Sequence, residues 1–276
     1  MTIDSHVHFW KYDKKRDAWI TNRMKILQQD YYPEHIALTL KRNGIDALIA
    51  VQADQSELET QFLVEMSKTH DNIKGVVGWI DLQNENIAER LDYFAQYSII
   101  KGWRHIVQGE KDDFMYGKPF RNGLATLQTY NYTYDILIYH HQLKAALDLV
   151  NDFPEQKFIT DHCAKPDIKE KKIDEWKVLI KAIAQNPNVY CKLSGLFTEA
   201  AWKSWSPAEF YPYLDIVFEA FGTDRLLYGS DWPVLLLSGS YVQWKSLLEK
   251  YMENFKEEDK LKVFGDNAIQ FYNLQS

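Results

Sequence analysis

The sequence predicts an α/β fold in which eight parallel strands, with helices between them, close into a (β/α)₈ barrel. Three observations predict it. Eight short apolar, β-branched runs recur along the 276 residues, helical patterns separate them, and no glycine-rich phosphate loop follows any run. An open doubly wound sheet is the alternative interpretation. Because 46% of the residues are hydrophobic, we expect one large core and a single domain over residues 1–276.

The eight runs are nearly continuous in apolar character, which is typical of strands covered on both faces. In chain order they are TIDSHVHF, IDALIAVQ, IKGVVGWIDL, SIIKGWRHIV, YTYDILIYHH, QKFITDHC, NVYCKLSG and RLLYGSDW. Parallel strands place all their carboxyl ends at one rim of the barrel. Barrels of this kind carry their active sites at that rim.

Capping signals mark the intervening helices. Ser56 and Glu59 form a capping box, which predicts a helix whose buried stripe contains Leu58, Phe62 and Met66.

Other helices and one long connection follow from similar signals. The segment 206–222 begins Ser-Pro-Ala-Glu and ends with glycine, which predicts a second helix. A third has an apolar stripe that starts at Trp176 and stops before Pro187. Residues 9–34 show no clear period, and long connections of this kind often build the pocket of a barrel.

Charge and composition exclude several classes of partner. The net charge is −7 and the basic residues are scattered, so no patch suited to nucleic acid is expected. No apolar run approaches the length of a membrane span, and no basic-then-apolar leader opens the chain. The two cysteines, Cys163 and Cys191, suit a reducing compartment and small core positions. We expect a cytoplasmic protein that acts on a small molecule and binds neither nucleic acid nor membrane; nothing in the sequence specifies an oligomeric state.

The first run contains a His-x-His pair. Side chains two apart on a strand share a face, which places Asp4, His6 and His8 together, with the histidines nearest the carboxyl end. Two neutral imidazoles can converge on one ion or one polarised oxygen. The alternative is that one of them only makes a buried hydrogen bond.

Two further residues end later runs. His162 lies near the end of the sixth run and Asp231 near the end of the eighth, with Gly229 expected to leave room beside the carboxylate. Asp231 can take a proton from water or bind a cation; the alternative is that it caps the next helix. Because all these residues end strands at the same rim, their joint occurrence favours one site.

Several motifs together resemble a known family. They are IDSHVHFW at the start, GWRH at 102–105, TDHCAKP at 160–166, YGSDWP at 228–233 and NAIQFY at 267–272. They resemble the amidohydrolase superfamily, in particular the amidohydrolase-2 branch with its fucono- and rhamnonolactonases and pyrone-dicarboxylate lactonase. The resemblance runs from the first strand to the last helix, and the DHxxKP and GSDWP motifs are its most specific part.

The resemblance implies a TIM barrel that hydrolyses a lactone. It implies that Asp231 activates the water, while His6, His8 and His162 surround the carbonyl or, with Asp231, hold one divalent ion. Zn²⁺ is the first choice, and catalysis without metal is the alternative. The fourth strand offers no lysine suited to bridging two metals, since Lys101 lies too early. We therefore do not expect a two-metal centre.

Six side chains are predicted to contact the substrate: Arg104, Lys165, His140, His141, Trp10 and Trp232. The arginine and the lysine are candidates to stabilise the oxyanion that forms when water attacks an ester carbonyl. The tryptophans would give a sugar-like ring a flat apolar wall.

The function expected first is hydrolysis of a sugar-acid lactone, such as L-fucono- or L-rhamnonolactone, in carbohydrate breakdown. A metal-dependent nonoxidative decarboxylase of the same superfamily is the alternative. A noncatalytic sugar-acid binding protein is a third interpretation, which the filled catalytic positions disfavour. The dicarboxylate pyrone is disfavoured as a substrate because arginines for its carboxylates are not evident near the motifs.

Overall fold

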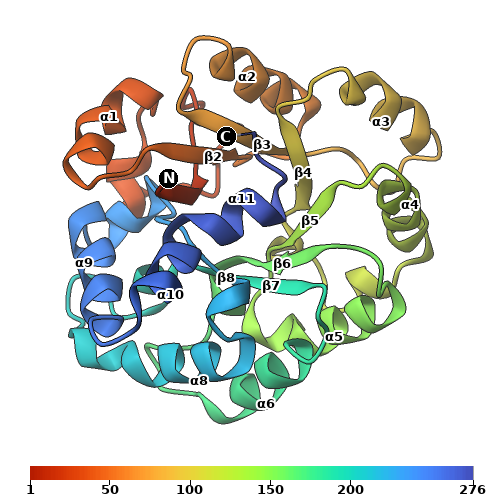
Figure 1. Ribbon diagram of the computed structural model, residues 1–276. Coiled ribbons are helices and arrows are strands. Elements are labelled where there is room, and N and C mark those ends of the chain that lie inside the picture. Colours follow the sequence, from red (N-terminus) through yellow and green to blue (C-terminus); the bar gives the residue numbers. More distant parts are fainter. Residues whose placement is uncertain (276) are drawn as a thin grey trace.

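The computed structural model describes residues 1–275 and contains one parallel sheet whose eight strands follow the order of the chain. The strands form the central ring in Figure 1, with the helices around it. They are β1 (Ile3–Val7), β2 (Ala47–Val51), β3 (Ile73–Gly78), β4 (Ile100–His105), β5 (Thr133–Ile136), β6 (Phe158–Thr160), β7 (Val189–Leu193) and β8 (Leu226–Tyr228). Each lies within one predicted run, so the predicted (β/α)₈ barrel is confirmed.

The ring closes where β1 meets the residues that follow β8. The amide of Asp231 donates to the carbonyl of His6 at 2.9 Å, and the amide of His8 donates to the carbonyl of Trp232 at 2.7 Å. We call the contact of these four residues the barrel seam. Three residues predicted to be catalytic, His6, His8 and Asp231, therefore take part, through their backbones, in closing the barrel.

Helices follow the strands, and all but α11 lie around the ring (Figure 1). They are α1 (Pro33–Arg42), α2 (Glu57–Ser67), α3 (Ile87–Ala95), α4 (Lys118–Thr129), α5 (Leu143–Asp152), α6 (Asp174–Ile183), α7 (Leu196–Glu199), α8 (Tyr211–Phe221), α9 (Tyr241–Tyr251), α10 (Glu257–Leu261) and α11 (Asn267–Phe271). The helix predicted for residues 206–222 starts as a 3₁₀ turn, Pro207–Glu209, and continues as α8. It ends at Gly222, whose φ is +64°. The prediction around Trp176 corresponds to α6.

The start of α2 follows the predicted cap only in part. The Ser56 hydroxyl accepts from the amide of Glu59 at 3.2 Å, as predicted. The Glu59 carboxylate, however, does not accept a hydrogen bond from the Ser56 amide, as a capping box requires. It turns inward and accepts from the amides of Ala53 and Asp54, which fixes the loop at the end of β2.

The predicted stripe of α2 is wrong at Leu58, which is 77% exposed. Met66 is buried as predicted and Phe62 is half-buried against the core, and the buried apolar face also carries Leu63 and Val64. The reason is Glu59: residues four apart share a face of a helix, so a Glu59 side chain that faces the loop brings Leu63 inward with it.

An apolar cluster fills the amino-terminal end of the barrel interior. Its members are Ile3, Ala47, Ile49, Val51, Val77, Ile159, Leu227, Ala268, Phe271, Tyr272 and Leu274. The last four come from the end of the chain, where α11 lies across the centre of the ring (Figure 1). The carboxyl-terminal segment thus forms the floor of the barrel. A much larger apolar cluster packs the helices against the outside of the strands.

The long first connection folds back on itself. Trp10 and Tyr31 exchange two backbone hydrogen bonds, of 3.0 and 2.8 Å, and the segment between them contains a 3₁₀ helix, Asn22–Leu27. Ile20 and Leu27 anchor it in the core.

Both cysteines are buried and free, which agrees with the prediction that they are small core residues. Among residues 1–275, no helix has the length and apolar character that crossing a membrane requires.

The buried Glu59 predicts a pH-dependent stability. Burial raises the pKa of Glu59 from 4.5 to about 8, despite the two amide hydrogen bonds. The folded state therefore holds a proton that the unfolded chain loses, and stability falls as pH rises between these two values. Glu59→Gln cannot ionise, so its stability relative to wild type should rise across this window, by on the order of 3 kcal/mol in total.

Urea unfolding at about pH 5 and about pH 8.5 measures this difference. Glu57→Gln is the control, because that carboxylate lies on the same helix and pairs with Arg90 near the surface. An equal Glu59→Gln effect at both pH values would contradict the prediction.

Candidate active site

The four predicted catalytic residues lie together at the carboxyl rim of the barrel. His6 is in β1, His8 follows that strand, His162 follows β6 and Asp231 follows β8. None is more than 4% exposed. The residues come from the beginning, the middle and the end of the chain, and the barrel brings them together.

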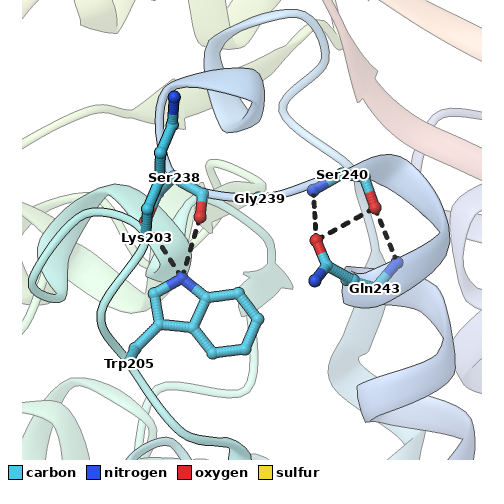
Figure 2. A pocket seen from close by; sticks show the side chains of 6 residues that line it. All are labelled: Lys203, Trp205, Ser238, Gly239, Ser240 and Gln243. Atoms are coloured by element: carbon cyan, nitrogen blue, oxygen red, sulfur yellow. Dashed lines mark hydrogen bonds between the residues drawn. The ribbon is translucent and has the colours of Figure 1, made fainter.

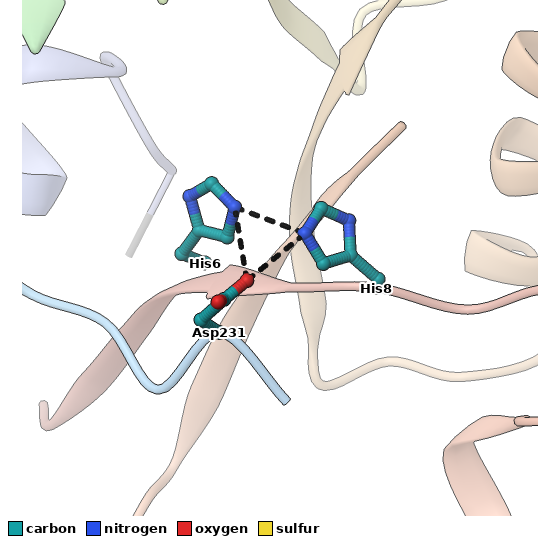
Figure 3. A group of neighbouring side chains, drawn as sticks. All are labelled: His6, His8 and Asp231. Carbon is teal, nitrogen blue, oxygen red and sulfur yellow. Dashed lines mark hydrogen bonds and ion pairs between the residues drawn. The ribbon is translucent and has the colours of Figure 1, made fainter. Parts of the chain in front are cut away.

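One oxygen of Asp231 lies among the three imidazoles. Its Oδ1 is 3.3 Å from Nε2 of His8, 3.8 Å from Nε2 of His6 and 3.9 Å from Nε2 of His162. The two Nε2 atoms of His6 and His8 are 3.1 Å apart. Figure 3 shows the two rings and the carboxylate converging on one point.

The tautomer of His8 follows from its second nitrogen. Its Nδ1 is 2.8 Å from the carbonyl oxygen of Val51. A carbonyl only accepts, so Nδ1 carries the proton, and in the neutral form of the ring Nε2 presents its lone pair to Asp231. Two acceptors that face each other at 3.3 Å are suited to a cation between them.

The donor set fits one tetrahedral ion. With bonds of about 2.0–2.1 Å, ligand atoms around Zn²⁺ stand about 3.3–3.4 Å apart. The triangle of His6 Nε2, His8 Nε2 and Asp231 Oδ1 has edges of 3.1, 3.3 and 3.8 Å. Imidazole nitrogen and carboxylate oxygen are also ligands that zinc prefers.

Two of these residues have unusual backbone conformations. Asp231 has φ of 60°, and residues 162–165 form four consecutive left-handed positions, with φ of 55° at His162. Such positions cost on the order of 1 kcal/mol each for residues with a Cβ atom, and they cluster at functional sites. The left-handed turn directs His162 back over the barrel, where its Nδ1 is 2.8 Å from the hydroxyl of Ser194.

Two glycines make room for the imidazoles. A Cβ atom on Gly195 would lie 2.5 Å from Cγ of His162, and one on Gly229 would lie 2.8 Å from Cβ of His6. The space expected beside Asp231 is therefore occupied by His6.

Asp4 does not join the histidines, contrary to the expectation of a shared face. Its carboxylate accepts from the amides of Ser230 and His6, at 2.8 and 3.1 Å, and from the hydroxyl of Tyr241 in α9 at 2.9 Å. The register of β1 against β2 shifts between Asp4 and Val7, which breaks the regular alternation.

A buried ionic layer lies directly beneath the site. Nζ of Lys192, in β7, is 2.5 Å from Asp135, 3.0 Å from Asp161 and 3.1 Å from Nδ1 of His6. All four side chains are fully buried. The sequence reasoning missed Lys192 and Asp135; the available signal was a charged residue inside each of two otherwise apolar runs.

Arg104 points into the barrel, as its position after Gly102 suggests, and belongs to the same layer. One guanidinium nitrogen donates to Asp161 at 2.8 Å and lies 3.3 Å from Nε2 of His6, and the other donates to the carbonyl of Gln52.

The protonation of the site follows from this environment. Burial lowers the pKa of His162 to about 4, although the charge of Asp231 opposes the shift. Burial, together with the charge of Lys192, holds the pKa of His6 well below its usual value. For Asp231 burial raises the pKa, but His162 and His8 lower it more, so the net shift is downward. The Asp231 carboxylate is therefore ionised near pH 7, and the imidazoles of His6 and His162 are neutral.

Of the predicted substrate contacts, Lys165 and His140 lie near one another at the rim. The Lys165 ammonium is 3.6 Å from Glu199 and 5.3 Å from the ring centre of Tyr139. Nδ1 of His140 bonds to the carbonyl of Lys165 at 3.1 Å. His141 faces outward and lies 3.3 Å from Asp112, with half of its side chain exposed.

The two predicted tryptophans are buried on either side of Tyr31. The ring centres of Trp10 and Trp232 are 5.3 and 5.0 Å from that of Tyr31. The indole nitrogen of Trp10 donates to the carbonyl of Gln29. The pair thus attaches the first connection to the residues that follow Asp231.

A separate cavity of about 370 Å³ opens between the connections that follow β7 and β8. It is lined by Lys203, Trp205, Ser238, Gly239, Ser240 and Gln243 (Figure 2). None of the predicted site residues lines it. The Trp205 nitrogen donates to Ser238, and Ser240 and Gln243 cap α9 reciprocally, so these polar groups already have partners.

The chain is similar to known proteins over nearly its whole length. The family model described as Amidohydrolase matches residues 3–274. An L-fucono-1,5-lactonase from Burkholderia multivorans is 35% identical, over 99% of this chain and 96% of that protein. An L-fucono-1,5-lactonase from Burkholderia ambifaria is 30% identical, over 99% and 95%. A crystal structure of an amidohydrolase from Burkholderia multivorans with bound zinc is 35% identical and covers both chains completely, with a TM-score of 0.95.

The support of His162 by Gly195 predicts a measurable cost of substitution. Gly195→Ala places a Cβ atom against the His162 ring at a residue whose φ is +64°. Gly44→Ala is the matched control, because Gly44 has φ of +65° and nothing within 4 Å of its Cβ position.

Gly44→Ala should lower the free energy of unfolding by about 1 kcal/mol, because alanine is strained at a positive φ. Gly195→Ala should lose this amount and roughly a further 1–3 kcal/mol, because the new methyl group overpacks the His162 ring. Urea unfolding of both variants measures the difference. Equal losses of unfolding free energy in the two variants would show that the His162 ring moves aside without destabilising the fold, which would contradict the prediction.

Proposed function

The chain belongs to the amidohydrolase family and is a hydrolase of sugar-acid lactones, and we propose that its substrate is L-fucono-1,5-lactone, with Asp231 as the base. The observation that carries the proposed roles is the convergence of three imidazoles on one ionised carboxylate at the barrel rim. The substrate is inferred from the two Burkholderia lactonases that the chain resembles over its whole length.

Asp231 takes a proton from water as the water oxygen attacks the carbonyl carbon of the lactone. The bond from that carbon to the ring oxygen then breaks, and the proton held by Asp231 passes to the ring oxygen, which becomes a hydroxyl. One water is consumed, and the product is the open-chain hydroxy acid. A lowered pKa keeps Asp231 ionised and ready to accept the proton near pH 7.

The carbonyl oxygen gains negative charge during the attack, and positioned donors stabilise it. Without a bound ion, we assign this role to His6 and His162, whose Nε2 atoms lie within 4 Å of Asp231. Arg104 adds positive charge from beneath, 3.3 Å from Nε2 of His6. His8 lies on the other side of Asp231, with its Nε2 3.3 Å from Oδ1.

His6, His8 and Asp231 would hold one divalent ion, for which Zn²⁺ is our first choice. The edges of their ligand triangle support this assignment. A related structure contains zinc. A bound ion supplies Lewis-acid polarisation of the lactone carbonyl.

The charges at the rim favour an uncharged substrate. Arg104 and Lys192 pair with Asp161, and Lys165 pairs with Glu199. A decarboxylase or a pyrone-dicarboxylate hydrolase needs a cationic group for the carboxylate of its substrate. A neutral aldonolactone needs none, and its hydroxyls suit polar side chains such as Lys165 and Glu199.

We place the reaction in carbohydrate breakdown in the cytoplasm. The free, buried thiols of Cys163 and Cys191 support a reducing compartment.

Asp231→Asn tests the assignment of the base. The variant keeps the shape of the side chain but cannot accept the proton, so kcat on L-fucono-1,5-lactone should fall by about 1,000-fold, with little change in KM. A pH indicator follows the acid that is released, with the spontaneous rate subtracted.

Asp224→Asn is the control, because its carboxylate is 75% exposed and pairs with Lys262 at the surface. An Asp231→Asn variant with wild-type kcat would remove Asp231 from the mechanism. Wild-type enzyme that left every aldonolactone at its spontaneous rate would overturn the function.

The lowered pKa values predict a broad pH profile. His162 is neutral above about pH 4, and the lowered pKa of Asp231 keeps it ionised at the ordinary pKa of aspartate. We therefore expect kcat/KM to stay level from about pH 8 to about pH 5 and to fall below that range as these groups gain protons. Initial rates in buffers of constant ionic strength measure the profile. A fall in kcat/KM centred near the ordinary pKa of histidine would contradict the prediction.

A further inference from the structure

His6 has a cationic donor next to its buried nitrogen. Nζ of Lys192 is 3.1 Å from Nδ1 of His6, whereas the nearest acceptor for an Nδ1 proton, Oδ1 of Asp161, is 3.5 Å away. An ammonium has only hydrogens to offer. The shorter contact is therefore satisfied when Lys192 donates and Nδ1 accepts.

The other nitrogen of His6 lies near one donor and one acceptor. The donor, the Arg104 guanidinium, is 3.3 Å from Nε2 and already donates to Asp161 at the shorter distance of 2.8 Å. The acceptor is His8. His8 holds its own proton on Nδ1, against the carbonyl of Val51, and so presents a lone pair at Nε2. That lone pair is 3.1 Å from Nε2 of His6. Two bare lone pairs would repel at this distance, and a proton on Nε2 of His6 makes the contact a hydrogen bond.

We propose that Lys192 is a positioning residue that holds the proton of His6 on Nε2, the nitrogen that faces the reaction centre. In the absence of an ion, a continuous series of hydrogen bonds then runs from Lys192 through His6 and His8 to Val51. The inference rests on the proposed function in that His6 is taken as a donor to the lactone carbonyl when no ion is bound, and as a ligand when the ion is bound.

The rest of the ionic layer holds Lys192 in place. Asp135 accepts from its ammonium at 2.5 Å and also from the hydroxyl of Tyr272 at 3.0 Å. The Lys192 ammonium also lies 5.7 Å from the ring centre of Tyr272. Because Tyr272 follows α11, the carboxyl-terminal segment helps to set the position of a group that contacts the catalytic histidine.

The arrangement has a consequence for ion binding. A nitrogen that carries a proton has no lone pair for a metal, so the ion must compete with the tautomer that Lys192 favours. The positive charge of Lys192, 3.1 Å from a ligand ring, also opposes a divalent cation. Lys192 therefore weakens the hold of His6 on the ion, while Asp161 is the acceptor that the ion-bound tautomer would use.

Lys192→Met tests the inference, because it keeps the length of the side chain and removes the donor and the charge. Full-length protein is stripped with a chelator, and its affinity for zinc is measured by competition with a chromophoric chelator. The variant should bind zinc at least about tenfold more tightly than wild type. Damage to the fold can only loosen a site, so tighter binding cannot come from a purely structural effect.

Tyr134→Phe is the matched control. It removes a fully buried hydroxyl from β5 that has no hydrogen-bond partner among the described residues, and zinc affinity should not change. A folded Lys192→Met variant with unchanged or weaker zinc affinity overturns the inference.

A second measurement needs no variant of Lys192. Long-range proton–nitrogen NMR spectra of metal-free wild-type protein, labelled at histidine, report which ring nitrogen carries the proton; His6→Asn identifies the His6 signals. We expect protonated Nε2, and protonated Nδ1 overturns the inference. Lactone hydrolysis by the same preparation is scored separately, so loss of the proposed function and loss of the tautomer assignment are distinct outcomes.

Discussion

The barrel seam is the contact on which the site depends. It joins β1 to the residues after β8 through hydrogen bonds between the backbones of His6, His8, Asp231 and Trp232. These bonds place the Asp231 carboxylate against two imidazoles without relying on any flexible side chain. Ser5 strengthens the same junction by donating its hydroxyl to the carbonyl of Tyr228 at 2.6 Å. Closing the barrel and assembling the site are therefore one structural event.

Beneath the seam, charge is almost balanced inside the protein. Arg104 and Lys192 lie against Asp135 and Asp161, and all four side chains are buried. A buried charge without a partner costs several kcal/mol, roughly, so each group requires the others. The balance leaves Asp231 with the one net negative charge of the cluster. Its charge is free for a reacting proton or a cation, while the layer below fixes the orientation of His6.

The sequence predicted the features that local patterns determine. Apolar runs located all eight strands, and the endings of the first, sixth and eighth runs located the residues that gather at the rim. The shifted register that turns Asp4 away and the pairing of Lys192 with His6 depend on contacts distant in the chain, which the sequence could not predict. The inward turn of Glu59 depends on amides only five and six residues away, but the capping-box pattern predicted a different partner for its carboxylate. A lysine in an apolar run indicates a buried charge, but the pattern does not predict which residue pairs with it.

The floor of the barrel adds a constraint on synthesis. Tyr272, at the end of α11, reaches through the apolar cluster to Asp135, and the seam requires residues beyond β8. A nascent chain therefore carries His6 and His8 long before their partners after β8 are synthesised. Until residues 226–272 have left the exit tunnel, the strands present an open edge and an uncovered apolar interior, which is the kind of surface that chaperones bind.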